Sequence, residues 1–504
     1  MRAIRDKEVR RDKLLFLISI LILVLFTLLV LPSSPLRSGN TWDDANAMLR
    51  IGQLWMNGTL PFRDVFEQRG LVMYLIYFIA NLFSSHGYVG LYIVELMNLF
   101  AILVLSKLVI SNFFNGERQL QSSFGALITV LLIMTNYSFK NGGSPEEFSL
   151  PWILMSILYV QRYAKKQNAK YFIPVGIGLA MVFNIKYSLI GPWVALGIIT
   201  FYLIFRLGEN IFKKIMMVLG YGALGLLVVF VPVVIYLTLT HSTEAFINAY
   251  FIENLSGYTK ESLPLMGHMV EALGMGLREL ASKNVVLTLA FFLATLALKD
   301  RSKAVAVHLI FIMTMMLSYW ALRPMDYMVL ILVFEMYFTI ILSLSQYLNV
   351  INVELYLGAI TIAFGLFTFV SSNLNPSFKL ATFGSPNADV VSSRFADKID
   401  QLGGAESLLY YNTIDFGVER YTSIPGSFRY FERTNLKLKE KDVEMDSIVR
   451  KGRADFIIVN DNNVHRDLMK KYKVVETGYK IKYNFYNNRS ATENKVKLYL
   501  MQKK

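Results

Sequence analysis

The sequence predicts a polytopic α-helical membrane protein with a small α/β domain at its C-terminal end. Hydrophobic residues form 54% of the 504 residues and charged residues only 17%, which is too apolar for an ordinary soluble protein of this length. Several apolar runs approach the roughly 20 residues that a helix needs to cross a bilayer. From about residue 374 the chain becomes polar and shows short strand-like runs instead.

Membrane spans are the first elements that we predict. We expect eleven, at 14–32, 88–110, 121–139, 148–162, 170–186, 188–206, 214–239, 284–299, 303–321, 327–346 and 354–372. A basic N-terminus followed by a long apolar run indicates an uncleaved first span that begins in the cytoplasm. With this orientation, four of the five cytoplasmic loops contain Lys or Arg, as the positive-inside rule requires. The absence of cysteine favours a bacterial source, and we expect a multi-pass protein of the bacterial plasma membrane.

Two long loops and the C-terminal segment are then predicted on the outer side, at 33–87, 240–283 and 374–504. The apolar run 71–83 has only thirteen residues, so we expect an interfacial helix on the outer surface rather than a span. We divide the chain into a transmembrane domain, 1–373, and a soluble extracytoplasmic α/β domain, 374–504. In the α/β domain we predict strands at "SLLYYN", "ADFIIVN", "KVVETGYKIKYNFY" and "KVKLYLMQ". We also predict a helix at "EKDVEMDSIVRKG" that ends at Gly452.

The charge pattern argues against several classes of function. The net charge of +14 comes from basic clusters between apolar runs, where they set membrane topology, so we expect no nucleic-acid partner. The five His residues show no metal-ligand spacing, and no metal site is predicted from them. A divalent cation held by carboxylates stays open.

An acidic pair opens the first outer loop, in "SGNTWDDANAMLR". Thr41 to Asp44 has the pattern of a helix N-terminus, with Thr41 as the cap and Asp44 reaching back to it. Asp43 is then free at the positive end of the helix dipole. An apolar stripe at helical spacing follows, formed by Ala45, Met48, Leu49, Gly52, Trp55 and Met56.

A second acidic pair repeats the pattern in another outer loop. Ser144 caps, Pro145 takes the first helical position and Glu147 closes the box, which leaves Glu146 without a structural role. Acids are common in the first turn of any helix, and this plain explanation stays open for each pair alone. Because both pairs are predicted on one side of the membrane, we expect Asp43 and Glu146 to share a cavity.

At this point the sequence resembles the GT-C superfamily of membrane glycosyltransferases, which includes bacterial aminoarabinose transferases and relatives of the protein O-mannosyltransferases. The first outer loop of many members runs as Asp-Glu, a Gly, Pro-Tyr-Arg-Asp and then Glu-x-Lys-Gly-Pro-Leu. This chain matches it with Asp43-Asp44, Gly58, Pro61-Phe62-Arg63-Asp64 and Glu67-Gln68-Arg69-Gly70-Leu71. It departs from it at Phe62, at Arg69 and in lacking a Pro before Leu71. "GGSPEEFSLPWIL" and "NIKYS" resemble the second acidic motif and an outward Lys, here Lys186.

The resemblance implies an inverting transfer of a hexose or pentose from a polyprenyl-phosphate donor, such as an undecaprenyl phosphate, to a cell-envelope glycan, lipid or protein on the outer face. Asp43 would be the general base, and Glu146 would orient hydroxyl groups. The donor phosphate would be held by Arg63, Arg69, Lys186, Arg323 and Tyr327. Supporting roles would fall to Asp44, Glu67 and Glu147. Relatives carry a His where this chain has Asp326, and Lys186 and Arg323 could also serve only as interfacial anchors.

Three other functions stay open. A transporter or flippase would place functional charge near the bilayer midplane, whereas here it lies at the outer edge. A polysaccharide polymerase or ligase would usually carry an arginine-rich outer loop, but the loop 240–283 holds only Lys260, Arg278 and Lys283. A non-catalytic scaffold for the outer domain is the third. Asp43→Asn tests all three: an enzyme should lose turnover but keep its fold and lipid binding, whereas a scaffold should be unaffected.

Overall fold

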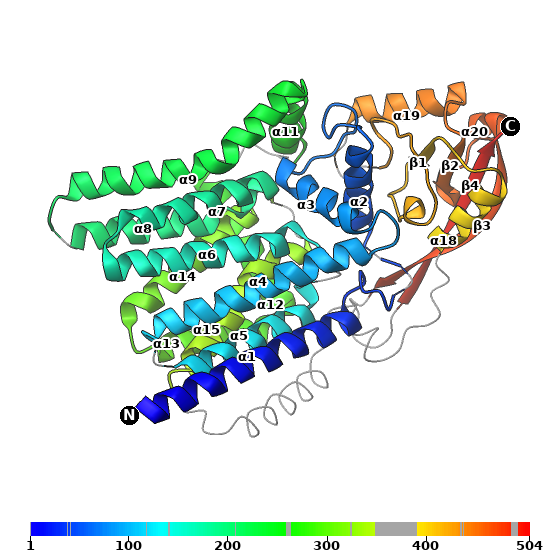
Figure 1. Cartoon of the computed structure of the whole chain (residues 1–504). Coiled ribbons are helices and arrows are strands. Elements are labelled where there is room, and N and C mark those ends of the chain that lie inside the picture. The colour runs from blue at the N-terminus through cyan, green and yellow to red at the C-terminus, as the bar shows by residue number, and fades with distance from the viewer. Residues whose placement is uncertain are drawn as a thin grey trace. The chain divides into compact units, whose positions relative to one another are not determined.

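The apolar runs of the sequence form helices, and the polar C-terminal segment forms a mixed sheet, in the computed structural model of the chain (Figure 1). The structure describes residues 2–37, 39–40, 42–116, 118–139, 142–206, 208–258, 264–322, 325–347, 391–433, 436, 438–484 and 492–504. The predicted span 354–372 and the predicted domain boundary after residue 373 lie outside these residues. The number of spans and the boundary therefore stay predictions.

The chain divides into two units, which we describe in turn. Unit 1 contains the described residues of Met1–Val30, Leu96–Val233 and Glu261–Phe378. Unit 2 contains those of Leu31–Glu95, Val234–Lys260 and Lys379–Lys504. The first predicted outer loop and the C-terminal domain thus belong to the same unit, although more than 280 residues of sequence separate them.

Unit 1 is built from helices. Its α-helices are α1 (Arg2–Val30), α5 (Gln119–Thr135), α6 (Pro145–Lys166), α7 (Phe172–Ile185), α8 (Gly191–Arg206), α12 (Leu265–Lys283), α13 (Val285–Ala297), α14 (Arg301–Ser318) and α15 (Leu330–Leu344), with most of α4 (Val89–Phe113) and α9 (Ile211–Leu239). Short helical turns are η1 (Tyr137–Phe139), η2 (Ala169–Tyr171), η3 (Tyr187–Leu189) and η5 (Asp326–Val329). Ten of the eleven predicted spans coincide with a helix.

By length and composition, six of the described helices could cross a membrane, or seven if the bent pair α12 and α13 counts as one. The axes of this pair meet at 110°. Three shorter apolar helices include Leu71–Phe83, the predicted interfacial segment. These helices identify a multi-pass membrane protein.

Close packing between helices of unit 1 depends on glycine. A Cβ atom on Gly176 of α7 would lie 2.1 Å from the carbonyl oxygen of Gly222 in α9. A Cβ on Gly225 would lie equally close to the carbonyl oxygen of Ile173. Two backbones that approach this closely gain van der Waals contact. In a bilayer this contact drives helix association, because lipid tails are as apolar as the side chains and no hydrophobic driving force remains.

Unit 2 combines helices of the outer loops with the sheet. Its helical elements are α2 (Asp43–Met56), α3 (Leu71–Phe83), α10 (Thr243–Ile247), η4 (Asn248–Ile252), α11 (Glu253–Tyr258), α18 (Val391–Gln401), η6 (Val418–Arg420), α19 (Lys439–Lys451), η7 (Asp461–Asn463) and α20 (Arg466–Lys471). The strands are β1 (Leu408–Tyr411), β2 (Phe456–Asn460), β3 (Tyr472–Asn484) and β4 (Thr492–Lys503). All four predicted strands and the predicted helix ending at Gly452 are present, and Gly452 has the left-handed φ of +61° that favours glycine.

The sheet has the strand order β1-β2-β4-β3. β1 and β2 are parallel, and β4 is antiparallel to both β2 and β3. Because parallel strands end at the same edge, the loops after Tyr411 and after Asn460 lie next to each other. This edge holds the candidate site of unit 2.

Two buried arginines fasten the first outer loop to the C-terminal domain within unit 2. Arg420 donates to the carbonyl oxygen of Gly87 at 2.7 Å and to Oδ1 of Asn81 at 2.7 Å. Arg50 of α2 donates to the carbonyl oxygen of Gly426 at 2.8 Å and lies 3.7 Å from Glu419. The polar side chains of Asn46, Arg50 and Gln53 in α2 are therefore buried, as are Ala45, Met48, Leu49 and Gly52 of its apolar stripe. A buried charge is tolerated only with such partners.

Candidate functional site

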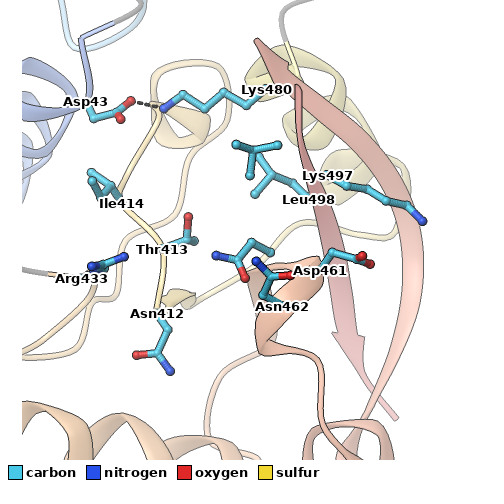
Figure 2. Close-up of a pocket in the computed structure, with 12 residues that line it drawn as sticks. Asp43, Asn412, Thr413, Ile414, Arg433, Asp461, Asn462, Lys480, Lys497 and Leu498 are labelled. Carbon is cyan, nitrogen blue, oxygen red and sulfur yellow. Dashed lines mark hydrogen bonds and ion pairs between the residues drawn. The ribbon is translucent and has the colours of Figure 1, made fainter. Parts of the chain in front are cut away.

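Asp43 begins α2, and its carboxylate forms an ion pair with Lys480 of β3 through Oδ1 (Figure 2). The other oxygen, Oδ2, has no partner among the described residues. Both side chains are about one-sixth exposed, at 17% for Asp43 and 16% for Lys480. The expectation that Asp43 is free of a partner is therefore wrong, because a lysine from a distant strand reaches it. One carboxylate oxygen nevertheless stays open to a ligand.

The pair lies at the wall of a cavity of about 410 Å³ at the carboxyl edge of β1 and β2. Figure 2 shows the loop after β1, with Asn412, Thr413 and Ile414, opposite η7 and strand β4. The other lining side chains come from Arg433, Asn460, Asp461, Asn462, Val496, Lys497 and Leu498. Crevices outside the carboxyl ends of parallel strands are a common place for ligands in α/β sheets. The cavity combines an acid, cations, amides and a small apolar wall.

Asp44, the second acid at the start of α2, takes part in a second cluster. Its Oδ2 accepts a hydrogen bond from Nη2 of Arg69 at 2.9 Å. Arg69 also donates to Oε2 of Glu67 at 2.7 Å, and the hydroxyl of Tyr74 donates to the same oxygen at 2.5 Å. The helix begins after Trp42, which gives no side-chain cap, so its start is one residue later than predicted. The predicted cap, Thr41, lies outside the described residues.

Arg69, Asp44 and Glu67 form a network of two ion pairs. One guanidinium joins two carboxylates, and all three side chains are at most about one-fifth exposed. Asp44 and Glu67 therefore hold Arg69 in a fixed direction. That Arg69 binds a phosphate stays a prediction.

Arg63 is oriented by its neighbour in the sequence. Its Nε and Nη2 donate to the two oxygens of Asp64 at 2.8 and 3.0 Å, and Nη1 donates to the carbonyl oxygen of Thr240 at 3.1 Å. The side chain is 44% exposed. Hydrogen bonding to Arg63 lowers the pKa of the Asp64 carboxyl. Arg63 as a phosphate ligand likewise stays a prediction.

In unit 1, Glu146 and Lys186 form the second acid–lysine pair. Nζ of Lys186 donates to Oε1 of Glu146 at 2.6 Å, and the carboxylate is completely buried. The lysine lies 5.5 Å from the centre of the Tyr327 ring, a cation–π distance. Oε2 of Glu146 is buried without a hydrogen-bond partner among the described residues. Three of the predicted site residues are thus brought together.

Glu147 has the capping role that the sequence predicts, with one difference. Its backbone NH donates to Oγ of Ser144 at 3.1 Å, as in a capping box. Its carboxylate accepts from the backbone NH of Gly143 at 2.6 Å rather than from that of Ser144. Asn98 adds a hydrogen bond to Oε1 at 3.3 Å. Glu147 therefore fixes the first turn of α6 and, with it, the position of Glu146.

A further cation cluster in unit 1 was not found from the sequence. Lys283 at the end of α12 forms an ion pair with Asp326, which also accepts from the hydroxyl of Tyr137 at 3.0 Å. Lys283 lies 5.1 Å from the centre of the Tyr137 ring. The sequence offered one signal, a lysine in an outer loop with few cations. The predicted Arg323 lies outside the described residues.

Lys480 was also missed, and nothing in its local sequence indicates a role. It is one of several lysines in the strand run that became β3. Only the packing of α2 against the C-terminal sheet, inside unit 2, places it beside Asp43. Asp43 and Glu146 belong to different units, so their shared cavity stays a prediction.

Buried acids surround the contact between the first outer loop and the C-terminal domain. Burial, together with the charge of Glu419, raises the pKa of Asp415 well above its usual value. Burial and the charge of Asp415 raise the pKa of Glu432 in the same way. Burial lowers the pKa of Arg420 to about 10. None of these groups is among the residues that line the pocket, although Asp415 and Glu432 directly follow and precede the lining residues Ile414 and Arg433.

No cluster of three or more His, Asp or Glu side chains suitable for a metal ion occurs among the residues that the structure describes. A divalent cation between Asp43 and Glu146 would need ligands from both units, and it stays open. The Asp43 pocket provides carboxylates and lysines, and the Glu146 cluster provides a carboxylate, a lysine and the tyrosine Tyr327. Their chemistry suits proton transfer and the binding of an anion or of hydroxyl groups.

Comparison with known proteins confirms the resemblance to the GT-C superfamily. Residues 70–236 match the family model of the dolichyl-phosphate-mannose-protein mannosyltransferases. The crystal structure of ArnT from Cupriavidus metallidurans bound to undecaprenyl phosphate matches with a TM-score of 0.61 and 12% identity, covering 97% of each chain. Its apo structure matches with a TM-score of 0.59 and 12% identity, covering 98% of each chain. No curated protein sequence matches this chain.

At 12% identity the two ArnT structures establish the fold over nearly the whole chain. The protein therefore has a GT-C glycosyltransferase fold with a C-terminal sheet region, as the sequence predicts. The family match covers residues 70–236, less than half of the chain.

Proposed function

We propose, with this glycosyltransferase fold as the premise, that the protein transfers a sugar from a polyprenyl-phosphate donor to a hydroxyl group of a cell-envelope acceptor. The donor class is suggested by the undecaprenyl phosphate bound to ArnT, whose fold this chain shares. The observation that carries the proposal is Asp43. Its carboxylate lies at the wall of a polar cavity, with one oxygen oriented by Lys480 and the other without a partner among the described residues.

The reaction would use Asp43 as the general base. Oδ2 accepts the proton of the acceptor hydroxyl while the acceptor oxygen forms a bond to the anomeric carbon of the sugar. The bond between that carbon and the phosphate oxygen breaks, and the electron pair leaves with the polyprenyl phosphate. A phosphate is a weak base, so this leaving group needs no strong general acid. Attack from the face opposite the phosphate inverts the anomeric configuration.

Glu146, Lys186 and Tyr327 would bind the donor. Glu146 has a buried oxygen without a hydrogen-bond partner among the described residues, and an unsatisfied buried acceptor costs about 1–3 kcal/mol unless a ligand hydroxyl satisfies it. Lys186 is 22% exposed, which leaves its ammonium group accessible to a phosphate oxygen. Arg63, Arg69 and Arg323 remain further candidates for the same anion.

The site would face the outer side of a bacterial plasma membrane. This orientation follows from the distribution of Lys and Arg between the apolar runs. A cysteine placed at exposed Val443 of α19 should react with a membrane-impermeant maleimide on intact cells. Labelling only after lysis would contradict the orientation.

The function is tested by mass spectrometry of lipid-linked sugars and surface glycans from cells with and without the protein. We expect one polyprenyl-phosphate sugar to accumulate and one surface glycan to lose a sugar when the protein is absent. Wild-type protein should restore the glycan, whereas Asp43→Asn should not. Unchanged glycans would overturn the proposal, and restoration by Asp43→Asn would point to a transporter or a scaffold.

A further inference from the structure

The pocket at the carboxyl edge of β1 and β2 holds more uncommitted polar groups than a general base requires. We propose that it is the acceptor site and that the acceptor is a carbohydrate, whose hydroxyl-rich ring is bound by the C-terminal domain. This inference rests on the proposed function and adds the chemical class of the acceptor to it.

The pocket is rich in side-chain amides. Asn412 and Asn462 line it from the two loops that follow the parallel strands, and neither side chain has a hydrogen bond to another described residue (Figure 2). Asn460, at the end of β2, also lines the pocket. Its Oδ1 is buried without a partner in the described part of the chain. Amides both donate and accept, which matches sugar hydroxyls.

The cavity has the size of a small-molecule site, and one of its walls is apolar. Its volume of about 410 Å³ lies in the ~300–1,000 Å³ range of small-molecule sites. Ile414, Val496 and Leu498 form an apolar surface on which the C–H face of a sugar ring can pack. A polar rim with a small apolar wall fits a sugar ring better than a lipid chain, which would need a continuous apolar surface.

Most of the charged side chains at the pocket have a partner among the described residues, but one cation does not. Asp43 is paired with Lys480, and Asp461 accepts from the hydroxyl of Tyr499 at 2.6 Å. The guanidinium of Arg433 has no partner among the residues that the structure describes, and this side chain is exposed. A guanidinium binds hydroxyl groups and carboxylates through paired N–H donors. We therefore assign Arg433 to acceptor specificity, with an acidic or hydroxyl-rich sugar as its ligand.

The position of Asp43 connects this pocket to the proposed chemistry. It is the one lining residue contributed by the first outer loop, and the others lie between residues 412 and 498. An acceptor sugar held by the asparagines would therefore present a hydroxyl group to Oδ2 of Asp43.

The test uses the full chain in lipid nanodiscs, because detergents with sugar headgroups would compete. Saturation-transfer NMR measures the binding of soluble disaccharides that contain hexose, N-acetylhexosamine or hexuronic acid. A Ser/Thr-rich peptide is the competing acceptor class. We expect binding of at least one disaccharide, weakened about tenfold or more by Arg433→Gln or Asn462→Ala, since each removes hydrogen bonds to the ligand.

Matched controls lie on the same unit away from the pocket. Arg450→Gln removes an exposed guanidinium from α19, and Asn57→Ala removes an exposed amide at the end of α2. Both should bind the disaccharide like the wild type. All variants should bind undecaprenyl phosphate equally, which shows that the pocket variants are folded.

The outcomes separate this inference from the proposed function. Absence of binding by every disaccharide, binding of the peptide alone, or equal binding by the pocket variants and the controls would overturn the carbohydrate pocket. None of these results changes the glycan analysis that tests sugar transfer. Presenting the best disaccharide on a lipid anchor in the same nanodisc, and comparing its affinity with that of the soluble form, distinguishes a glycolipid from a polysaccharide as its source.

Discussion

The two acid–lysine pairs of the molecule are built from the same chemistry but differ in the exposure of the acid. Asp43 and Lys480 are each about one-sixth exposed and line a cavity, and they lie 437 residues apart in the sequence. Glu146 is completely buried, and Lys186 follows it by 40 residues. An ion pair by itself therefore does not identify a catalytic group.

Accessibility distinguishes the parts that the two acids can play. A general base must reach the proton that it removes, and Oδ2 of Asp43 opens to a cavity. A buried carboxylate that is already bonded to a lysine is better suited to hold a group in place, because moving it would leave an uncompensated charge. We therefore assign proton transfer to Asp43 and positioning to Glu146.

The largest expected effect comes from Asp43→Asn. An amide cannot accept the proton of the acceptor, so the turnover number should fall by about 10²–10⁴-fold. Donor binding should change little. The measurement is transfer of sugar from a polyprenyl-phosphate donor by the reconstituted protein. Turnover within a factor of three of the wild type would remove Asp43 from the mechanism and end the contrast between the two pairs.

The second effect is on stability and concerns the pair of Glu146 and Lys186. Glu146→Gln leaves Lys186 without its carboxylate partner, but 22% of the Lys186 side chain is exposed, so the cost should stay below the roughly 3–5 kcal/mol of breaking a fully buried pair. We expect a lower midpoint in thermal unfolding followed by tryptophan fluorescence. The double variant Glu146→Gln, Lys186→Met should recover part of the loss, because it removes both charges. A double variant less stable than the single one would show that the lysine has another partner.

The third effect is smaller than the first two, and it is a dependence of the folding stability on pH. The pKa values of Asp415 and Glu432 are raised by burial and by neighbouring carboxylates, so the folded chain holds their protons more tightly than the unfolded chain. Their ordinary values are 3.8 and 4.5, and the stabilising contribution is complete below these values. It is lost as the pH rises through the folded-state pKa values.

We therefore expect the midpoint of thermal unfolding to fall as the pH is raised from about 5 to 8. The variant Asp415→Asn, Glu432→Gln keeps neutral hydrogen-bonding groups and should flatten this dependence. The same measurement on Asp43→Asn should show the wild-type slope. An unchanged slope in the double variant would mean that these two acids do not titrate in this range.

The smallest effect is expected from an exposed pair in the same unit. Asp467 and Lys470 are 2.8 Å apart in α20, and their side chains are 58% and 72% exposed. Water and salt screen such a pair, so Asp467→Asn should change neither stability nor sugar transfer measurably. It is the matched control for Asp43→Asn, since both replace an aspartate paired with a lysine. Loss of transfer in the control would show that the assay responds to any loss of charge on this unit.

Local sequence patterns predicted much of the fold because they report interactions between near neighbours. Apolar runs gave ten of the predicted spans as helices, and the strand-like runs gave all four strands. The box formed by Ser144 and Glu147 was predicted for the same reason, since both partners lie within one helical turn. The similar box at Thr41 and Asp44 stays a prediction, because Thr41 lies outside the described residues, and one oxygen of Asp44 accepts from Arg69.

The candidate site was predicted only in part. Asp43, Glu146, Lys186 and Tyr327 were identified, and the last three lie together in unit 1. Lys480 and the asparagines of the pocket were missed. Their role depends on contacts between segments hundreds of residues apart, for which a single sequence carries no periodic signal.

By itself, the sequence determined the membrane-spanning character, the small C-terminal sheet region and the acids that open α2 and α6, because hydrophobic transfer and helix capping act over short stretches of chain. Only the tertiary structure decided which lysine meets each acid. It also decided that the first outer loop and the last hundred residues fold as one unit around the buried Arg50 and Arg420. Charges removed from water must find partners wherever the chain can supply them, and that choice is made by the packing of distant segments.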